Sequence, residues 1–89
     1  MEWKDYGFVV ISKYRKKVVL ALLKHPMTPR QISNETKINI SHISRTLHEL
    51  TRKQIVFCMT PDRVKGRVYS LTEKGTRIAK LIKNNQTMS

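Results

Sequence analysis

Short polar and cationic side chains gather near the start of one predicted helix, residues 39–54. Apolar side chains recur along it at steps of three and four residues, which form one stripe on a helix of 3.6 residues per turn. The stripe consists of Ile40, Ile43, Leu47 and Leu50. The outer surface begins with Ser41, His42, Ser44 and Arg45. Their hydroxyl, imidazole and guanidinium groups can reach base edges in a major groove, whereas an ordinary surface helix favours Glu and Lys. The alternative is a plain amphipathic surface helix.

The charge balance of the chain indicates a polyanionic partner. Lys and Arg number 18 against 6 Asp and Glu, which gives a formal net charge of +12 and a pI near 10.4. Nucleic acid is the most plausible partner and an anionic membrane the second. A generally basic, solvated surface is the alternative, and charge alone does not separate DNA from RNA.

The composition also excludes several classes of protein. With 89 residues, the chain has room for one domain. A single cysteine, Cys58, excludes an internal disulfide, and no Cys or His spacing resembles a zinc site, so we expect neither metal nor cofactor. The longest apolar run, residues 18–23, is far shorter than the ~20 residues of a membrane span. We expect a cytoplasmic, nucleoid-associated protein with no membrane contact.

Catalysis is not expected either. It needs a nucleophile beside a base, paired carboxylates or metal ligands. Only Cys58 with one of the three histidines, His25, His42 and His48, could serve. Cys58 lies in an apolar strand pattern, which favours a buried structural thiol and leaves a redox response open.

The first quarter of the chain predicts an extension followed by an unusually apolar helix. Residues 1–11 favour a short helix over a strand, and Ser12 can cap the helix that follows. That helix ends at His25, because the residue before Pro26 is pushed out of the helical region. Residues 18–23 are apolar on every side, more than so small a domain can cover, so we expect a homodimer. Val19, Leu23, residues 3–11 and the face with Ile78, Leu81 and Ile82 are candidate contacts.

The same helix begins with Lys13, Arg15, Lys16 and Lys17. Two interpretations stay open for this cluster. It is either a solvated helix start or a phosphate contact beside the helix at 39–54. Cations in a first turn oppose the helix dipole, which slightly favours a functional role.

Residues 28–54 predict a helix-turn-helix. Thr28 is an N-cap, Pro29 suits the first helical position and Gln31 completes a capping box. Met27 and Ile32 can form a hydrophobic staple across this start. The first helix is about two turns long, and Asn39 caps the second. Two short helices joined by a tight turn form this motif.

The period of the pattern changes after Gln54. Residues 55–59 and 67–71 favour two strands, and the turn between them has Pro61, Asp62 and Gly66 as turn residues. Thr72 caps a last helix. The expected divisions are the extension 1–11, helix 12–25, helix-turn-helix 28–54, wing 55–71, C-terminal helix 72–84 and tail 85–89.

The order of these elements resembles the winged helix-turn-helix transcriptional regulators, which are mainly α with a β-hairpin wing. More narrowly, the chain looks like small archaeal members related to the arsenic-repressor and multiple-antibiotic-resistance-repressor groups. The likeness rests on four segments, 12–15, 27–32, 41–50 and 58–75. One departure is Gln54, because such families place Gly after the recognition helix, and a left-handed Gln is strained. The exit from that helix is therefore expected to differ.

The resemblance implies a sequence-specific transcriptional regulator that binds double-stranded DNA. The sequence names no effector. Ser41, His42, Ser44 and Arg45 would enter the major groove. Arg63, Lys65 and Arg67 of the wing would lie along phosphates or in a minor groove. Further expected backbone contacts are Thr28, Arg30, Asn39, His48 and Arg52. The alternatives are a winged helix used for protein–protein contact, which the cationic wing disfavours, and one that binds RNA.

Overall fold

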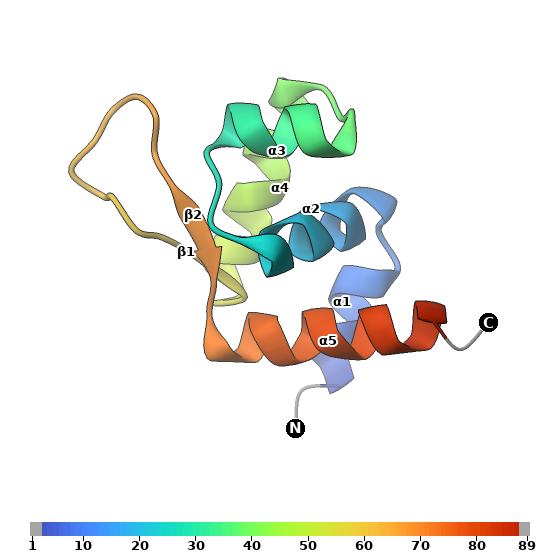
Figure 1. The fold of residues 1–89 in the computed structure, drawn as a ribbon. Helices are drawn as coiled ribbons and strands as arrows, with labels where there is room; N and C mark the ends of the chain where they lie inside the picture. Colours follow the sequence, from blue (N-terminus) through green and yellow to red (C-terminus); the bar gives the residue numbers. More distant parts are fainter. Residues whose placement is uncertain (1–2, 88–89) are drawn as a thin grey trace.

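The computed structural model describes residues 3–87, with five helices and a two-stranded antiparallel hairpin (Figure 1). In chain order the elements are α1 (Trp3–Val10), α2 (Lys13–Lys24), α3 (Pro29–Thr36), α4 (Ile40–Arg52), β1 (Val56–Cys58), β2 (Tyr69–Leu71) and α5 (Glu73–Thr87). The hairpin extends away from the helices on one side. The expected fold class is confirmed: a mainly α winged helix-turn-helix.

Helix α2 lies at the centre and packs against α1, α3, α4, α5 and β2. Its side chains Val18, Val19 and Leu22 are buried within the chain itself. The expectation that this run exceeds what one subunit can cover is therefore wrong, because the extension and the last helix close over it. Only Leu20 and Leu23 stay half-buried.

The helix starts follow the predicted caps. The Ser12 hydroxyl oxygen accepts from the Arg15 backbone N–H at 3.3 Å. Thr28 and Gln31 form the reciprocal capping box, with bonds of 3.2 and 2.8 Å. Asn39 Oδ1 accepts from the Ser41 N–H at 2.9 Å. These bonds satisfy backbone donors that a helix start otherwise leaves without partners.

The end of α4 keeps the left-handed residue that the sequence made doubtful. Gln54 has φ 60°, and the Ile55 N–H donates to the Leu50 carbonyl at 3.0 Å while that of Gln54 donates to Thr51, also at 3.0 Å. This is a Schellman motif. The helix exit therefore does not depart from the pattern, although a side chain at this φ costs about 1–2 kcal/mol.

The wing strands are shorter than expected and gain a partner that the sequence did not predict. Val56 pairs with Leu71 and Cys58 with Tyr69. Met27 then joins the other edge of β2, with bonds of 3.0 and 2.8 Å to the backbone of Tyr69. One extended residue beside a proline has no strand pattern of its own. Cys58 is only half-buried, so the expectation of a buried thiol is wrong.

Helix α5 is longer than expected. It continues to Thr87, so residues 85–87 belong to it rather than to a tail, and residues 88–89 lie outside the described range. The apolar face of α5 also differs from the expected one. Ile78 and Ile82 are buried in the chain's own core, whereas Leu81 is 42% exposed.

The N-terminal helix docks on the same subunit. An ion pair of 3.0 Å joins Asp5 to Lys74, and the Asn85 amide donates to the Tyr6 hydroxyl at 2.8 Å. Val9 is fully buried. The helix expected within residues 1–11 is confirmed over Trp3–Val10, and Trp3 at its start stays 64% exposed.

Gly75 provides a test of how α5 meets the wing. A Cβ there would lie 2.0 Å from the Ile55 carbonyl oxygen, and that oxygen already accepts from the Thr72 N–H at 3.0 Å. We expect Gly75→Ala to lower the free energy of unfolding by about 1–3 kcal/mol, because the backbone must shift. Gly7→Ala, in a helix and with nothing within 4 Å of its Cβ, should raise it by about 0.5–1 kcal/mol. Urea unfolding measures both, and an equal effect would contradict the close approach.

Candidate nucleic-acid interface

The outer face of α4 presents most of the side chains that the sequence singled out. Its buried stripe is Ile43, Thr46, Leu47 and Leu50. Ile40, expected in that stripe, is 44% exposed instead, because it belongs to the first turn, beyond the edge of the core. The exposed side chains of the helix include Ser41, Ser44, Arg45, His48 and Arg52. Within residues 3–87, no ion pair engages Arg45, so its guanidinium is available to a ligand.

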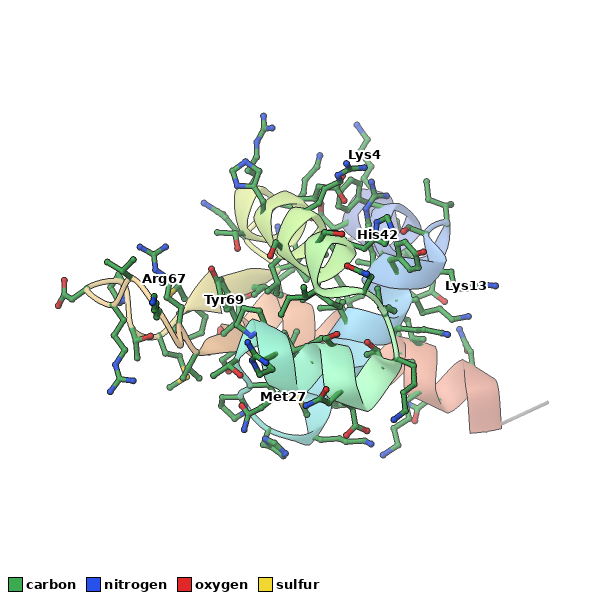
Figure 2. All side chains as sticks on the ribbon, turned by 90° about the horizontal axis from the view of Figure 1, so that it is seen from above. Lys4, Lys13, Met27, His42, Arg67 and Tyr69 are labelled. Carbon is green, nitrogen blue, oxygen red and sulfur yellow. The ribbon has the colours of Figure 1, made fainter. Side chains whose placement is uncertain are left out.

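His42 lies at the edge of this face rather than on it. The side chain is half-buried, and its ring centroid is 5.0 Å from that of Tyr14, with the planes tilted by 36°. The contact holds the imidazole against the first turn of α2. In Figure 2, which views the molecule from above, His42 lies close to the helix that carries Lys13.

The other fixed point of this edge is Arg15. Its Nε donates to Glu49 Oε1 at 3.2 Å, and its Nη1 donates to the Phe8 carbonyl at 2.9 Å. The guanidinium carbon also lies 3.8 Å from the centroid of the Phe8 ring. Arg15 therefore joins α1, α2 and α4, and Lys53 Nζ adds a second cation 5.2 Å from that ring.

These contacts decide how α4 is held. Tyr14 and Arg15 are consecutive on α2, and their partners His42 and Glu49 are two turns apart on α4. Such spacing puts both partners along one edge of the helix. The side of α4 that adjoins this edge buries Leu47 and Leu50. The rotation of α4 about its axis is thus fixed, and the direction of Ser41 and Arg45 with it.

The wing carries its three predicted cations in solvent. Arg63, Lys65 and Arg67 are all exposed. The loop is closed by backbone bonds, from Met59 N to Val68 O at 2.7 Å and from Arg63 N to Thr60 O at 3.1 Å. Arg67 Nε also donates to the Arg63 carbonyl. The side chain of Arg67 is therefore held by the loop backbone, while Lys65 lies at the tip beside Gly66, which has φ 67°.

Two of the predicted backbone contacts, Thr28 and Asn39, are the N-caps of α3 and α4. Arg30 is exposed, whereas Thr28 is half-buried, and its hydroxyl oxygen already accepts from the Gln31 N–H. The Asn39 side chain likewise accepts from Ser41 at both the backbone N–H and the hydroxyl, at 2.9 and 2.8 Å. A backbone contact by Thr28 or Asn39 therefore stays a prediction, and each group has a structural role in the cap.

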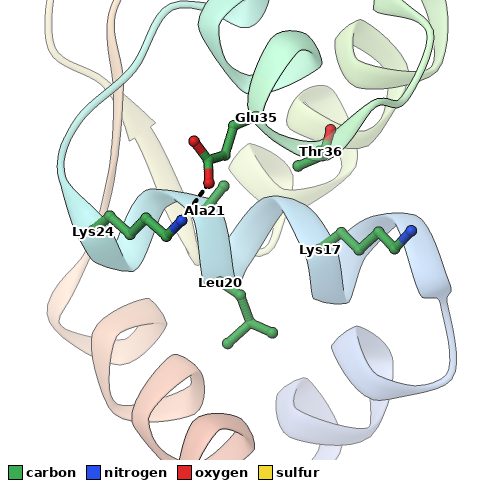
Figure 3. A pocket seen from close by; sticks show the side chains of 6 residues that line it. All are labelled: Lys17, Leu20, Ala21, Lys24, Glu35 and Thr36. Carbon is green, nitrogen blue, oxygen red and sulfur yellow. Dashed lines mark hydrogen bonds and ion pairs between the residues drawn. The ribbon is translucent and has the colours of Figure 1, made fainter.

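A shallow hollow of about 270 Å³ lies between α2 and α3, away from the outer face of α4 (Figure 3). An ion pair between Lys24 and Glu35 crosses its rim, and the hydrogen bond from Lys24 lowers the pKa of the Glu35 carboxyl. Both side chains are exposed, so the pair adds little to stability. Of the residues considered for DNA contact, Lys17 of the cationic cluster lines this hollow.

Two further findings bear on metal binding and on membrane insertion. In the described part of the chain, no three His, Cys, Asp or Glu side chains come together as a candidate metal site. No helix among residues 3–87 is long and apolar enough to span a bilayer.

No family model and no curated protein matches the sequence. Several solved structures match this chain. The transcriptional repressor BigR from Xylella fastidiosa matches with a TM-score of 0.82 at 21% identity, over 98% of this chain and 85% of its own. A double mutant of ZitR from Lactococcus lactis gives a TM-score of 0.77 at 18% identity, over 86% and 53%. The chain has the winged-helix fold.

A MarR family transcription regulator is also similar, with a TM-score of 0.71 at 24% identity, over 82% of this chain and 50% of its own. The chain thus spans about half the length of the ZitR and MarR-family structures that it resembles. At these identities the likeness concerns the fold. It does not extend to the side chains of α4 and the wing.

The cluster around Arg15 gives a prediction about stability. Arg15→Ala removes an ion pair, a hydrogen bond and a ring contact, so we expect the free energy of unfolding to fall by about 2 kcal/mol. Glu49→Ala removes the ion pair alone and should cost about 0.5–1 kcal/mol. Lys17→Ala, which deletes an exposed cation of the same helix, is the control and should change it by less than about 0.5 kcal/mol. Equal losses for Arg15→Ala and Lys17→Ala in urea unfolding would refute the bridging role.

Proposed function

We propose that the protein is a transcriptional regulator that binds double-stranded DNA in a sequence-specific manner. Helix α4 would lie in the major groove, and the basic loop at residues 60–67 would lie on the backbone or in a minor groove. The observation that carries the proposal is the outer face of α4, where short hydroxyls and an unpaired Arg45 are exposed together. The net charge of +12 and the similar fold of the repressor BigR support it.

Arg45 is the best candidate for reading a base. It lies in the second turn of α4, close to the end that enters a groove in helix-turn-helix proteins. A guanidinium can donate two hydrogen bonds to O6 and N7 of guanine. Ser41, Ser44 and His42 would accompany it, with His42 limited to the side of the groove next to Tyr14.

The remaining candidates would position the helix. His48 and Arg52 continue the outer face of α4 towards its end, and Arg30 is exposed at the start of α3. Together with the three wing cations they offer charges to phosphates, which fix register without reading sequence.

RNA binding is the alternative that shares this surface. A-form RNA has a deep, narrow major groove that a helix cannot enter. Duplex RNA should therefore compete with duplex DNA only through the phosphate contacts. Competition of the two duplexes at equal charge separates the two functions.

A second copy of the chain is the proposed partner. The candidate contacts must be revised, because Val19, Ile78 and Ile82 are buried in the chain's own core. Among the residues that the structure describes, the large apolar side chains exposed in the N-terminal region and last helix are Trp3, Ile11 and Leu81. Two-fold pairing would place two α4 helices about one DNA turn apart, roughly 34 Å, and favour a pseudo-palindromic site.

The roles of α4 and the wing can be separated by two variants. Arg45→Ala should lose about 1–3 kcal/mol at a site selected from random duplexes and relax preference at one or two base pairs. Lys65→Ala should weaken binding to all duplexes about equally and lower the salt slope by about one. The measurement is affinity for the selected site and for random DNA at several salt concentrations. Unchanged discrimination by Arg45→Ala would show that α4 is not the reader.

Dimerisation gives a further test. Sedimentation equilibrium at tens of micromolar should show a dimer, and Leu81→Glu or Ile11→Glu should shift it towards monomer, because a charge would be buried at the contact. Val64→Glu is the matched control, since Val64 is 90% exposed in the wing, which extends away from the helices (Figure 1). A wild-type monomer, or an equal shift by all three variants, would contradict the proposed pairing.

A further inference from the structure

The four cations at the start of α2 have different surroundings in the fold. Arg15 is engaged by Glu49 and Phe8. Lys16 is half-buried and lines a hollow with residues of α1 and α5. Lys13 and Lys17 remain exposed. The four cations, which form one cluster in the sequence, therefore differ in their surroundings. Lys13 and Lys17 are the two that are exposed to a ligand.

Tyr14 connects this turn to the start of α4. Its ring lies 5.0 Å from His42, yet 40% of the side chain is exposed. His42 belongs to the first turn of α4, the end with Ser41 and Arg45. Tyr14 and its neighbour Lys13 therefore lie beside the end of the helix proposed to enter DNA.

The wing lies on the other side of α4. In the view from above, Figure 2 shows Arg67 to one side of His42 and Lys13 to the other. A helix in a major groove, which is about 12 Å wide, has a phosphate backbone along each wall. The wing cations can serve one wall, and the first turn of α2 is placed to serve the other.

We propose that Lys13 and Tyr14 form a second contact with the DNA backbone, across α4 from the wing. The proposal rests on the proposed function, because it needs α4 in the groove. Lys13 supplies a point charge, and the Tyr14 hydroxyl can donate a hydrogen bond to a phosphate oxygen. The tilted ring contact with His42 holds the Tyr14 ring in place, so that little side-chain freedom is lost on binding.

Binding of random-sequence duplex DNA over a series of salt concentrations tests this site without knowledge of the target sequence. Lys13→Gln should lower the slope of log K against log salt by about 0.9, the value for one phosphate contact. Lys16→Gln removes the same charge three residues away, on the side towards α1 and α5, and should leave the slope unchanged. Tyr14→Phe keeps the ring and its contact with His42, and should weaken binding about 3- to 10-fold with an unchanged slope.

The outcomes are distinguishable. Equal slopes for Lys13→Gln and Lys16→Gln would reduce the effect to general electrostatics and overturn the site, as would a Tyr14→Phe variant with wild-type affinity. If those variants match the wild type while Lys65→Ala still lowers the slope, the proposed function stands and only the second contact fails. A wild-type protein that does not bind duplex DNA would overturn both.

Discussion

The burial of α2 is the constraint on which the rest of the fold depends. Residues 18–23 are apolar on every side of the helix, and such a helix is stable only when it is covered on every side. Helices α1, α3, α4 and α5 and strand β2 all pack on it. Because the apolar half is covered, the first turn is left at the surface, where it can contact α4 and solvent at once. The central core and the proposed interface are thus two ends of one helix.

That first turn holds α4, the proposed recognition helix, by its edge. Tyr14 contacts His42, and Arg15 binds Glu49 while it also holds Phe8 of α1. Partly buried contacts to charged groups are stronger than those in full solvent, because less screening water surrounds them. Because these contacts hold α4 at its edge, the polar side chains of its outer face are not needed for packing and are available to a ligand. The same connection makes α1 a neighbour of the proposed DNA-binding surface.

Local signals in the sequence predicted the helix boundaries well, because capping is a local interaction. Thr28 and Gln31, or Asn39 and Ser41, lie within three residues of each other, so their bonds follow from order along the chain. The hairpin was predicted from its period and its turn residues. The extent of α5 was not, because residues 85–87 carry no apolar pattern, and the hydrogen bond from Asn85 to Tyr6 of α1 joins residues that are far apart in the sequence.

The sequence by itself indicated the elements, a basic surface suited to a polyanion and the helix that carries the candidate base contacts, since composition and periodicity are properties of the chain alone. Tertiary structure decided which of those residues are available. Val19, Ile78 and Ile82 are buried in the chain's own core. His42 packs against Tyr14. Arg15 forms an ion pair with Glu49, whereas Lys13 stays exposed. Each of these outcomes depends on pairs of residues from different helices. The direction of a side chain around a helix can be read from spacing, but what it meets there depends on how the helices pack.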